Sequence, residues 1–258
     1  MKRAATTQEP DPAVPTGSGP RRRGPAGWQV TGLLRATHPR QTLLTAAGLA
    51  AAAALSGRPL REVGLVFATV LVGQLVLAWH NEVVDRERDA RHGTPGKPLA
   101  DGRVEPGNAW YAIAVAVLLL VPLAVSHGVV AGLWYLISVA VGLLANVSLR
   151  RTPLSFLPWA VVWGLYPFFL AAGGWAGEGT DASPTTEMVV LFALLGVGLH
   201  VLRSLPGLVA DHEDGWRSLP LLVALRTGAT KLLVLAGAWT VLVVVALLVV
   251  GRSTGLRA

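Results

Sequence analysis

Oxygen-bearing side chains recur every four residues within the stretch WHNEVVDRERDARHGTPGKPLADGRVEPG, which spans residues 79–107. Asn81, Asp85 and Asp89 stand at positions i, i+4 and i+8. If residues 79–89 continue a helix, these three side chains form one stripe that drifts by only about 40° per step. Carboxylate and amide oxygens suit a hard divalent cation such as Mg²⁺, which also keeps water and phosphate in its shell. We therefore interpret Asn81, Asp85 and Asp89 as candidate metal ligands.

A solvated start of a loop is the competing interpretation of this acidic stretch, with neighbouring arginines neutralising the acids. A second acidic cluster weighs against it. The sequence ADHEDGW carries Asp211, Glu213 and Asp214, so that six of the fifteen acidic residues fall in 82–105 and three in 211–214. Two such clusters that face each other could hold two metal ions around one diphosphate. Four basic residues predicted on the same membrane face could take up charge on a departing diphosphate: Lys97, Arg103, Arg150 and Arg217.

The elements that position these residues are predicted to be membrane-spanning helices. The chain of 258 residues is 52% hydrophobic and only 14% charged, with a mean hydropathy of +0.53. A hydrocarbon core of about 30 Å is crossed by a helix of about 20 apolar residues. Seven apolar segments approach that length: 41–57, 62–81, 108–126, 129–148, 154–173, 187–206 and 230–250. The prediction is an all-α, polytopic transmembrane bundle of about seven spans.

Basic residues predict the orientation of this bundle. With the N-terminus in the cytoplasm, eighteen lysines and arginines lie inside and four outside, which is a strong positive-inside bias. Both acidic clusters then face the cytoplasm, and the protein is expected in the cell membrane.

The net charge of +7 does not indicate nucleic acid binding, because the basic residues lie in short loops between apolar segments. Residues 1–27 form a predicted disordered basic tail, and residues 28–258 form the transmembrane domain. Without cysteines, the chain has no thiolate metal site.

Several of these motifs, taken together and in order, resemble the UbiA-type intramembrane prenyltransferases. NEVVDRERD, from Asn81, is similar to the family's N-D-x-x-D-x-x-x-D motif, and GKPLADGRV, from Gly96, is similar to its continuation. RRTPLSFLP, from Arg150, resembles the stretch after the fourth helix. LPGLVADHEDGWRSLP, from Leu205, resembles the second aspartate motif. ATHPR, at 36–40, resembles the start of the first helix, so the matches extend over about residues 33–228.

The resemblance implies a Mg²⁺-dependent transfer of a prenyl group from a prenyl diphosphate to a lipophilic or aromatic acceptor within the membrane. Carried over by position, Asn81, Asp85, Asp89 and Asp211 contact metal or diphosphate, with Asp85, Asp89 and Asp211 as the catalytic carboxylates. Lys97 and Arg150 would face the diphosphate. Asn146, late in the fourth span, suits either an interhelical hydrogen bond or a substrate contact.

Three departures from the family pattern keep other functions open. Glu82 replaces an aspartate of the first motif, Gly207 stands where the second motif usually begins with aspartate, and the family usually has nine helices. A non-catalytic, decayed membrane relative is one alternative. A membrane terpene cyclase, which ionises the diphosphate without an external acceptor, is the other.

Overall fold

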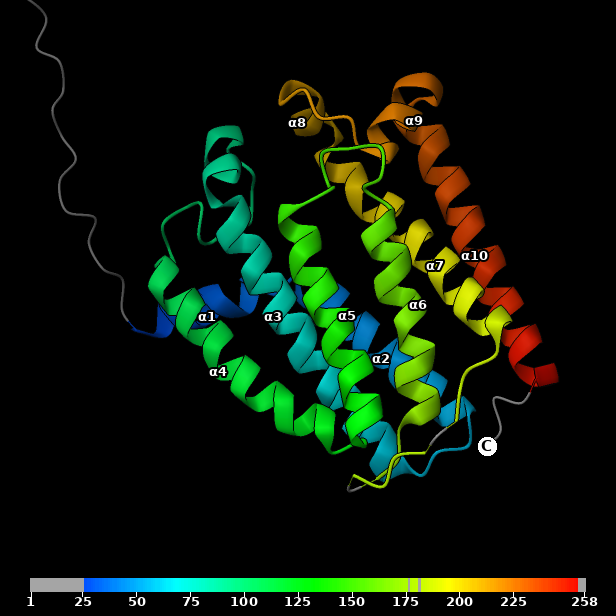
Figure 1. Ribbon diagram of the computed structural model, residues 1–258. Helices are drawn as coiled ribbons and strands as arrows, with labels where there is room; N and C mark the ends of the chain where they lie inside the picture. Colours follow the sequence, from blue (N-terminus) through cyan, green and yellow to red (C-terminus); the bar gives the residue numbers. More distant parts are fainter. Residues whose placement is uncertain (1–25, 176, 181, 255–258) are drawn as a thin grey trace, which may run out of the picture.

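The computed structural model describes residues 26–175, 177–180 and 182–254, and this part of the chain folds into helices without strands (Figure 1). The predicted all-α class is therefore confirmed. The tail predicted over 1–27 falls on residues outside the described part, except that the first helix already begins at Ala26. In chain order the helices are α1 (Ala26–Ala36), α2 (Pro39–Leu55), α3 (Leu60–His92), α4 (Pro106–Val125), α5 (Val129–Val147), α6 (Leu157–Ala172), α7 (Thr186–Ser204), the 3-10 turn η1 (Leu205–Gly207), α8 (Leu208–Glu213), α9 (Leu219–Thr227) and α10 (Ala229–Thr254).

Each of the seven predicted apolar segments coincides with a helix, namely α2 to α7 and α10. Five helical stretches are long and apolar enough to cross a membrane: α3, α4, α5, the continuous stretch Thr186–Glu213, and α10. With 17 and 16 residues, α2 and α6 are shorter than that. The transmembrane character is thus supported, whereas the count of seven spans and the cytoplasmic N-terminus stay predictions.

The helix α3 carries the first acidic motif beyond its apolar part. It has 33 residues, which at 1.5 Å per residue is about 50 Å and exceeds a hydrocarbon core of about 30 Å. It ends at Gly93, whose left-handed conformation (φ 59°) suits glycine after a helix C-terminus. The helix predicted over residues 79–89 is therefore confirmed, and the acidic stripe lies on its last three turns.

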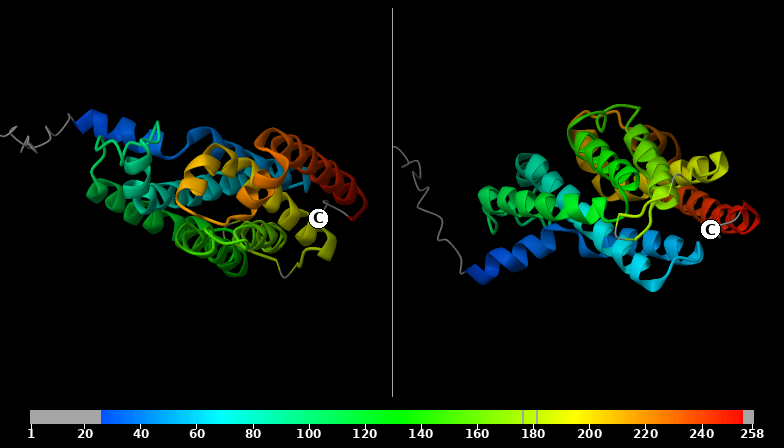
Figure 2. Two further views of the ribbon diagram at one scale, coloured as in Figure 1. Left: turned by 90° about the horizontal axis from the view of Figure 1, so that it is seen from above. Right: turned by 60° about the horizontal axis from the view of Figure 1, so that its bottom comes forward.

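Polar segments that are far apart in the sequence gather at one end of the bundle. We call this the polar end, and define it as residues 81–105, 148–156 and 205–218. In Figure 1 the end of α3, the connection between α5 and α6, and α8 all lie at the top. Seen from above, in the left view of Figure 2, α8 lies over the middle of the bundle, and α10 lies at its edge beside α7. The fold thus brings both acidic motifs to the same end.

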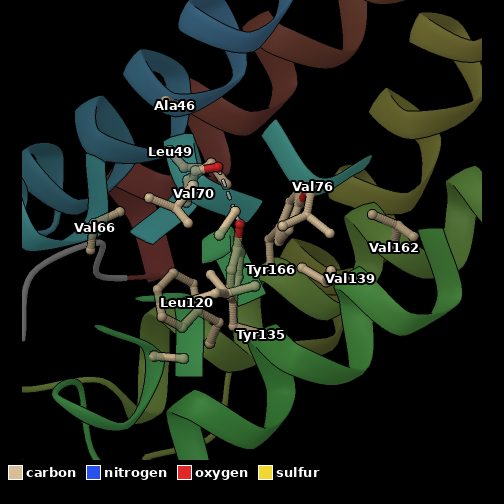
Figure 3. Close-up of a cluster of buried hydrophobic side chains, with 14 of the residues drawn as sticks. Ala46, Leu49, Val66, Val70, Val76, Leu120, Tyr135, Val139, Val162 and Tyr166 are labelled. Atoms are coloured by element: carbon tan, nitrogen blue, oxygen red, sulfur yellow. Dashed lines mark hydrogen bonds between the residues drawn. The ribbon is translucent and has the colours of Figure 1, made fainter. Parts of the chain in front are cut away.

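Tyrosines and small aliphatic residues fill the core between α3, α5 and α6 (Figure 3). Tyr135 and Tyr166 are almost completely buried, with their rings stacked at a centroid distance of 6.3 Å. The hydroxyl of Tyr135 donates a hydrogen bond to the backbone oxygen of Val70, 3.3 Å away. Gly73 leaves the space for this hydroxyl, because a Cβ there would lie 2.2 Å from it. This packing fixes α3 against α5 and α6 and so fixes the walls of the site.

The close contact between α6 and α7 depends on Gly196, and we predict that Gly196→Ala destabilises the protein. A Cβ at this position would lie 2.5 Å from the backbone oxygen of Trp159 and 2.8 Å from the Cβ of Trp163. The two helices must separate to accept it, at a cost of about 1–3 kcal/mol. Thermal unfolding in detergent measures the effect. Gly48→Ala is the control, since Gly48 lies on α2 with nothing within 4 Å of its Cβ position. Equal melting temperatures for the two variants would contradict this packing.

Candidate functional site

A cavity of about 560 Å³ opens at the polar end and extends inward between α2, α3, α5, α6 and α7. Its volume lies within the range of small-molecule sites, about 300–1,000 Å³. Seven of the nine residues predicted from the sequence to form the site line this cavity: Asn81, Asp85, Asp89, Lys97, Asn146, Arg150 and Asp211. The fold therefore joins α3, α5, the α5–α6 connection and α8 into one site.

The remaining two predicted residues do not line the cavity. Arg103 is exposed and pairs with Asp101, two residues away. Arg217 is exposed, and its backbone nitrogen donates a hydrogen bond to the backbone oxygen of Arg151. Both belong to the polar end, but their side chains have no place among the residues that surround the cavity.

Three acidic side chains of the cavity are buried, and each is paired with a cation. Asp85, Asp89 and Asp211 have exposed fractions of 8%, 7% and 8%. Arg150 donates to Asp85. The Nζ of Lys97 lies 3.3 Å from an oxygen of Asp89. Burial of an unpaired carboxylate is costly, so these pairs explain how the acids are tolerated inside the bundle.

Glu82 anchors the loop that follows α3. It is 1% exposed, and it accepts a hydrogen bond of 2.7 Å from the Nζ of Lys97. The Nε2 of His38, at the start of α2, lies 3.3 Å from the same carboxylate oxygen. Burial acts to lower the pKa of Lys97, but the charges and hydrogen bonds of Glu82 and Asp89 outweigh burial, so the pKa is raised. Lys97 is therefore a fixed, protonated cation at the cavity.

We predict that Glu82→Ala destabilises the protein, because it leaves Lys97 and His38 without their shared buried partner. Removal of one partner from a buried ion pair costs about 3–5 kcal/mol, and the greater exposure of the second partner, His38, reduces that figure. Glu87→Ala is the matched control, since Glu87 is exposed on the same helix. Thermal unfolding of the two variants in detergent gives the comparison. A melting temperature for Glu82→Ala as high as for Glu87→Ala would show that the ion pairs of Glu82 do not stabilise the protein.

Arg88 joins the two acidic motifs, and sequence reasoning missed it. Its Nη2 lies 2.7 Å from Asp211 and its Nε 2.5 Å from Asp214, while its guanidinium lies 4.0 Å from the ring centroid of Trp216. The hydrogen bond from Arg88 is the main cause of the lowered pKa of Asp214. Asp211 itself lies on the short helix α8. Arg88 therefore ties α3 to the second motif across the mouth of the cavity.

Asn146 fulfils the first of its two predicted roles and also lines the cavity. Its amide donates to the backbone oxygen of Leu77 at 3.1 Å and lies 3.2 Å from the Nδ1 of His80. These contacts join α5 to α3. Gly207 lines the cavity as well, and a Cβ there would meet only one oxygen of Asp211, at 4.0 Å. Space for a larger side chain is thus present where the family pattern has aspartate.

The inner part of the cavity has an aromatic wall. Trp159, Trp163 and Tyr166 of α6 line it, and the rings of Trp163 and Tyr166 pack edge to face at 5.4 Å. His200 of α7 also lines it and is fixed by a 3.0 Å hydrogen bond with Ser155. The cavity therefore changes from charged at its mouth to aromatic inside. That gradient suits a ligand with an anionic head and a hydrophobic body.

The oxygen donors of the cavity fit a hard divalent cation by type. Three carboxylates and one amide, from Asp85, Asp89, Asp211 and Asn81, line the same space. Within the described ranges, no three histidine or acidic side chains are arranged closely enough to hold a metal ion. The carboxylates are instead occupied by arginine and lysine. Metal binding at these residues therefore requires exchange of these ion pairs.

Comparison with known proteins gives matches of family and of fold. Residues 42–256 match the model of the UbiA prenyltransferase family. The structure is similar to that of a UbiA homologue from Aeropyrum pernix K1, with a TM-score of 0.64 and 23% identity over 85% of this chain and 81% of the other. None of the curated proteins matches the chain.

Two further solved structures share the fold. A UbiA homologue from Archaeoglobus fulgidus bound to Cd²⁺ has a TM-score of 0.61 and 16% identity over 82% of this chain and 76% of the other. A digeranylgeranylglyceryl phosphate synthase has a TM-score of 0.58 and 19% identity over 84% and 75%. The family match covers most of the chain and agrees with the resemblance of its two acidic motifs. The chain therefore belongs to the UbiA prenyltransferase family.

Proposed function

We propose that this chain uses Mg²⁺ to transfer a prenyl group from a prenyl diphosphate to a lipophilic or aromatic acceptor within the membrane. The observation that carries the proposal is that Asp85 and Asp211, from two distant motifs, line one cavity together with Lys97 and Arg150. Membership of a prenyltransferase family supports it. The Cd²⁺-bound homologue supports a divalent cation in this fold.

Asn81, Asp85, Asp89 and Asp211 are the residues that would hold Mg²⁺. When bound, the ion supplies positive charge that stabilises the negative charge developing on the leaving diphosphate. The chain's own cations act in the same sense. Lys97 and Arg150 are already held beside the carboxylates, and they can donate hydrogen bonds to phosphate oxygens as the allylic C–O bond breaks and its electron pair leaves with the diphosphate.

The aromatic wall then acts on the allylic cation. The ring faces of Trp159, Trp163 and Tyr166 attract positive charge and exclude water from it. A nucleophilic carbon of the acceptor attacks the cation, a C–C bond forms, and the acceptor loses a proton. We assign the polar end to the cytoplasmic side, because the basic loops of the chain gather there.

The experiment is incubation of the purified protein in lipid nanodiscs with Mg²⁺ and a panel of prenyl diphosphates, with and without aromatic acceptors. Released pyrophosphate and prenylated products are measured by enzymatic assay and mass spectrometry. We expect prenylated product, and we expect a chelator to abolish it. Hydrocarbon products in the absence of acceptor would make the protein a cyclase. No pyrophosphate release with any donor would leave it a non-catalytic member of the family.

A further inference from the structure

Arg88 bridges two carboxylates of the second acidic motif, in the manner of a bound cation. Its Nη2 lies 2.7 Å from Oδ1 of Asp211, and its Nε lies 2.5 Å from Oδ2 of Asp214. Arg150, by comparison, donates to one oxygen of Asp85. A positive group held between two carboxylates occupies the kind of position that a divalent metal ion takes in a two-metal site.

Further contacts hold the guanidinium of Arg88 in this position. Its side chain is 16% exposed, and it lies 4.0 Å from the ring centroid of Trp216. The other oxygen of Asp214 lies 3.0 Å from the Nε2 of His92, in the last turn of α3. Groups of α3 therefore contact both oxygens of Asp214. Exchange of Arg88 for a metal ion would break its contacts with two carboxylates and one aromatic ring at once.

The second acidic motif also offers few carboxylates to a metal ion. Gly207 stands where the family pattern has aspartate, one helical turn before Asp211. A Cβ at Gly207 would lie 4.0 Å from Oδ1 of Asp211, which is the oxygen that accepts from Arg88. Asp214 is held by α3, and the side chain of Glu213 is 60% exposed. For a second metal ion, the motif thus offers mainly Asp211, one oxygen of which is bonded to Arg88.

The charge of the cavity wall acts against a second metal ion as well. Among the described residues that line the cavity, the basic ones exceed the acidic ones by four to three: Arg88, Lys97, Arg150 and Arg203, against Asp85, Asp89 and Asp211. The wall is therefore positive before any metal ion binds. A divalent ion close to Arg88 would meet a like charge, whose repulsion is strong in a partly buried site.

We propose that Arg88 takes the place of one metal ion, so that this protein holds its diphosphate with a single Mg²⁺ rather than with two. The inference rests on the proposed function, because it states how metal and protein share the charge of the same diphosphate. The single ion is held by the stripe of α3 and by the second oxygen of Asp211. The remaining N–H groups of Arg88 can donate hydrogen bonds to phosphate oxygens.

The number of bound metal ions tests this inference without turnover. The full-length protein in lipid nanodiscs is titrated with Mn²⁺, a paramagnetic substitute for Mg²⁺, in the presence of an unreactive prenyl thiolodiphosphate. The electron paramagnetic resonance signal of free Mn²⁺ gives the bound amount, after subtraction of empty nanodiscs with the same ligand. We expect one tightly bound Mn²⁺ per wild-type chain, which Mg²⁺ displaces.

A double variant should create the second metal site. Arg88→Ala releases Asp211 and Asp214, and Gly207→Asp adds the aspartate of the family pattern. We expect two Mn²⁺ per chain, with the second bound at least about tenfold more tightly than any second ion of the wild type. Arg86→Gln is the matched control, because Arg86 is exposed on the same helix and does not line the cavity. This control should bind one Mn²⁺.

The possible results separate this inference from the proposed function. Two Mn²⁺ per wild-type chain would overturn the inference and leave the proposed function standing, so the wild-type count decides even if the double variant does not fold. A folded double variant that binds only one Mn²⁺, or a wild type that binds none, would also overturn it. One ion in the wild type and two in the variant, in a protein that releases no pyrophosphate from any donor, would uphold this inference and refute the proposed function.

Discussion

Asp85→Asn is expected to lower prenyl transfer by about a hundredfold or more while the protein stays folded. Asp85 lies on the acidic stripe of α3, lines the cavity and accepts from Arg150. Asparagine keeps the size of the side chain but removes the negative charge. That loss weakens the proposed hold on Mg²⁺ and leaves Arg150 without the partner that fixes its position.

Steady-state release of pyrophosphate, together with thermal unfolding, measures this effect. Asp101→Asn is the matched control, because Asp101 is an exposed aspartate of the same polar end that does not line the cavity. It should react at the rate of the wild type. Full activity of Asp85→Asn, or an equal loss in the Asp101 variant, would remove Asp85 from the proposed mechanism.

Arg150→Gln is expected to have the second large effect. It should lower kcat/KM for the prenyl diphosphate donor by about tenfold to a hundredfold. Arg150 reaches the cavity from the α5–α6 connection, where Leu149 adopts a left-handed conformation with φ 58°. Its guanidinium donates to Asp85 and lies 5.1 Å from the ring centroid of Trp216. A lost charged hydrogen bond to phosphate accounts for about 1.5–3 kcal/mol.

The adjacent residue offers the control. Arg151 is exposed and does not line the cavity, so Arg151→Gln should change kcat/KM little. Arg150→Lys should recover part of the activity, because it restores the charge without the planar fork. If the two glutamine variants lose the same activity, general charge at the polar end matters rather than Arg150 itself.

Local periodicity explains what could be predicted from the sequence. The spacing of Asn81, Asp85 and Asp89 predicts one helical stripe, and α3 presents it as expected, because four-residue spacing is a property of the helix alone. Apolar segment length likewise predicts where the helices lie. It does not determine how many of them cross the membrane, since α2 and α6 are short and pack as parts of the bundle.

Contacts between distant segments could not be predicted in this way. Arg88 has charge neighbours within its own motif, and its real partners, Asp211 and Asp214, lie more than 120 residues away. In the sequence, Arg203 is only one of the basic residues that predict the membrane orientation. In the folded chain it lines the cavity. Arg103 and Arg217 share the polar end with the site, but the paths of their loops direct them elsewhere.

A double-mutant cycle on donor affinity tests the central claim that carboxylates of α3 and α8 act together on one bound diphosphate. The measured quantity is the Mg²⁺-dependent affinity for an unreactive prenyl thiolodiphosphate in the wild type, Asp85→Asn, Asp211→Asn and the double variant. Two groups that share one ligand should be coupled by about 1 kcal/mol or more. Losses that add to within about 0.5 kcal/mol, or an affinity that none of the variants changes, would contradict the claim.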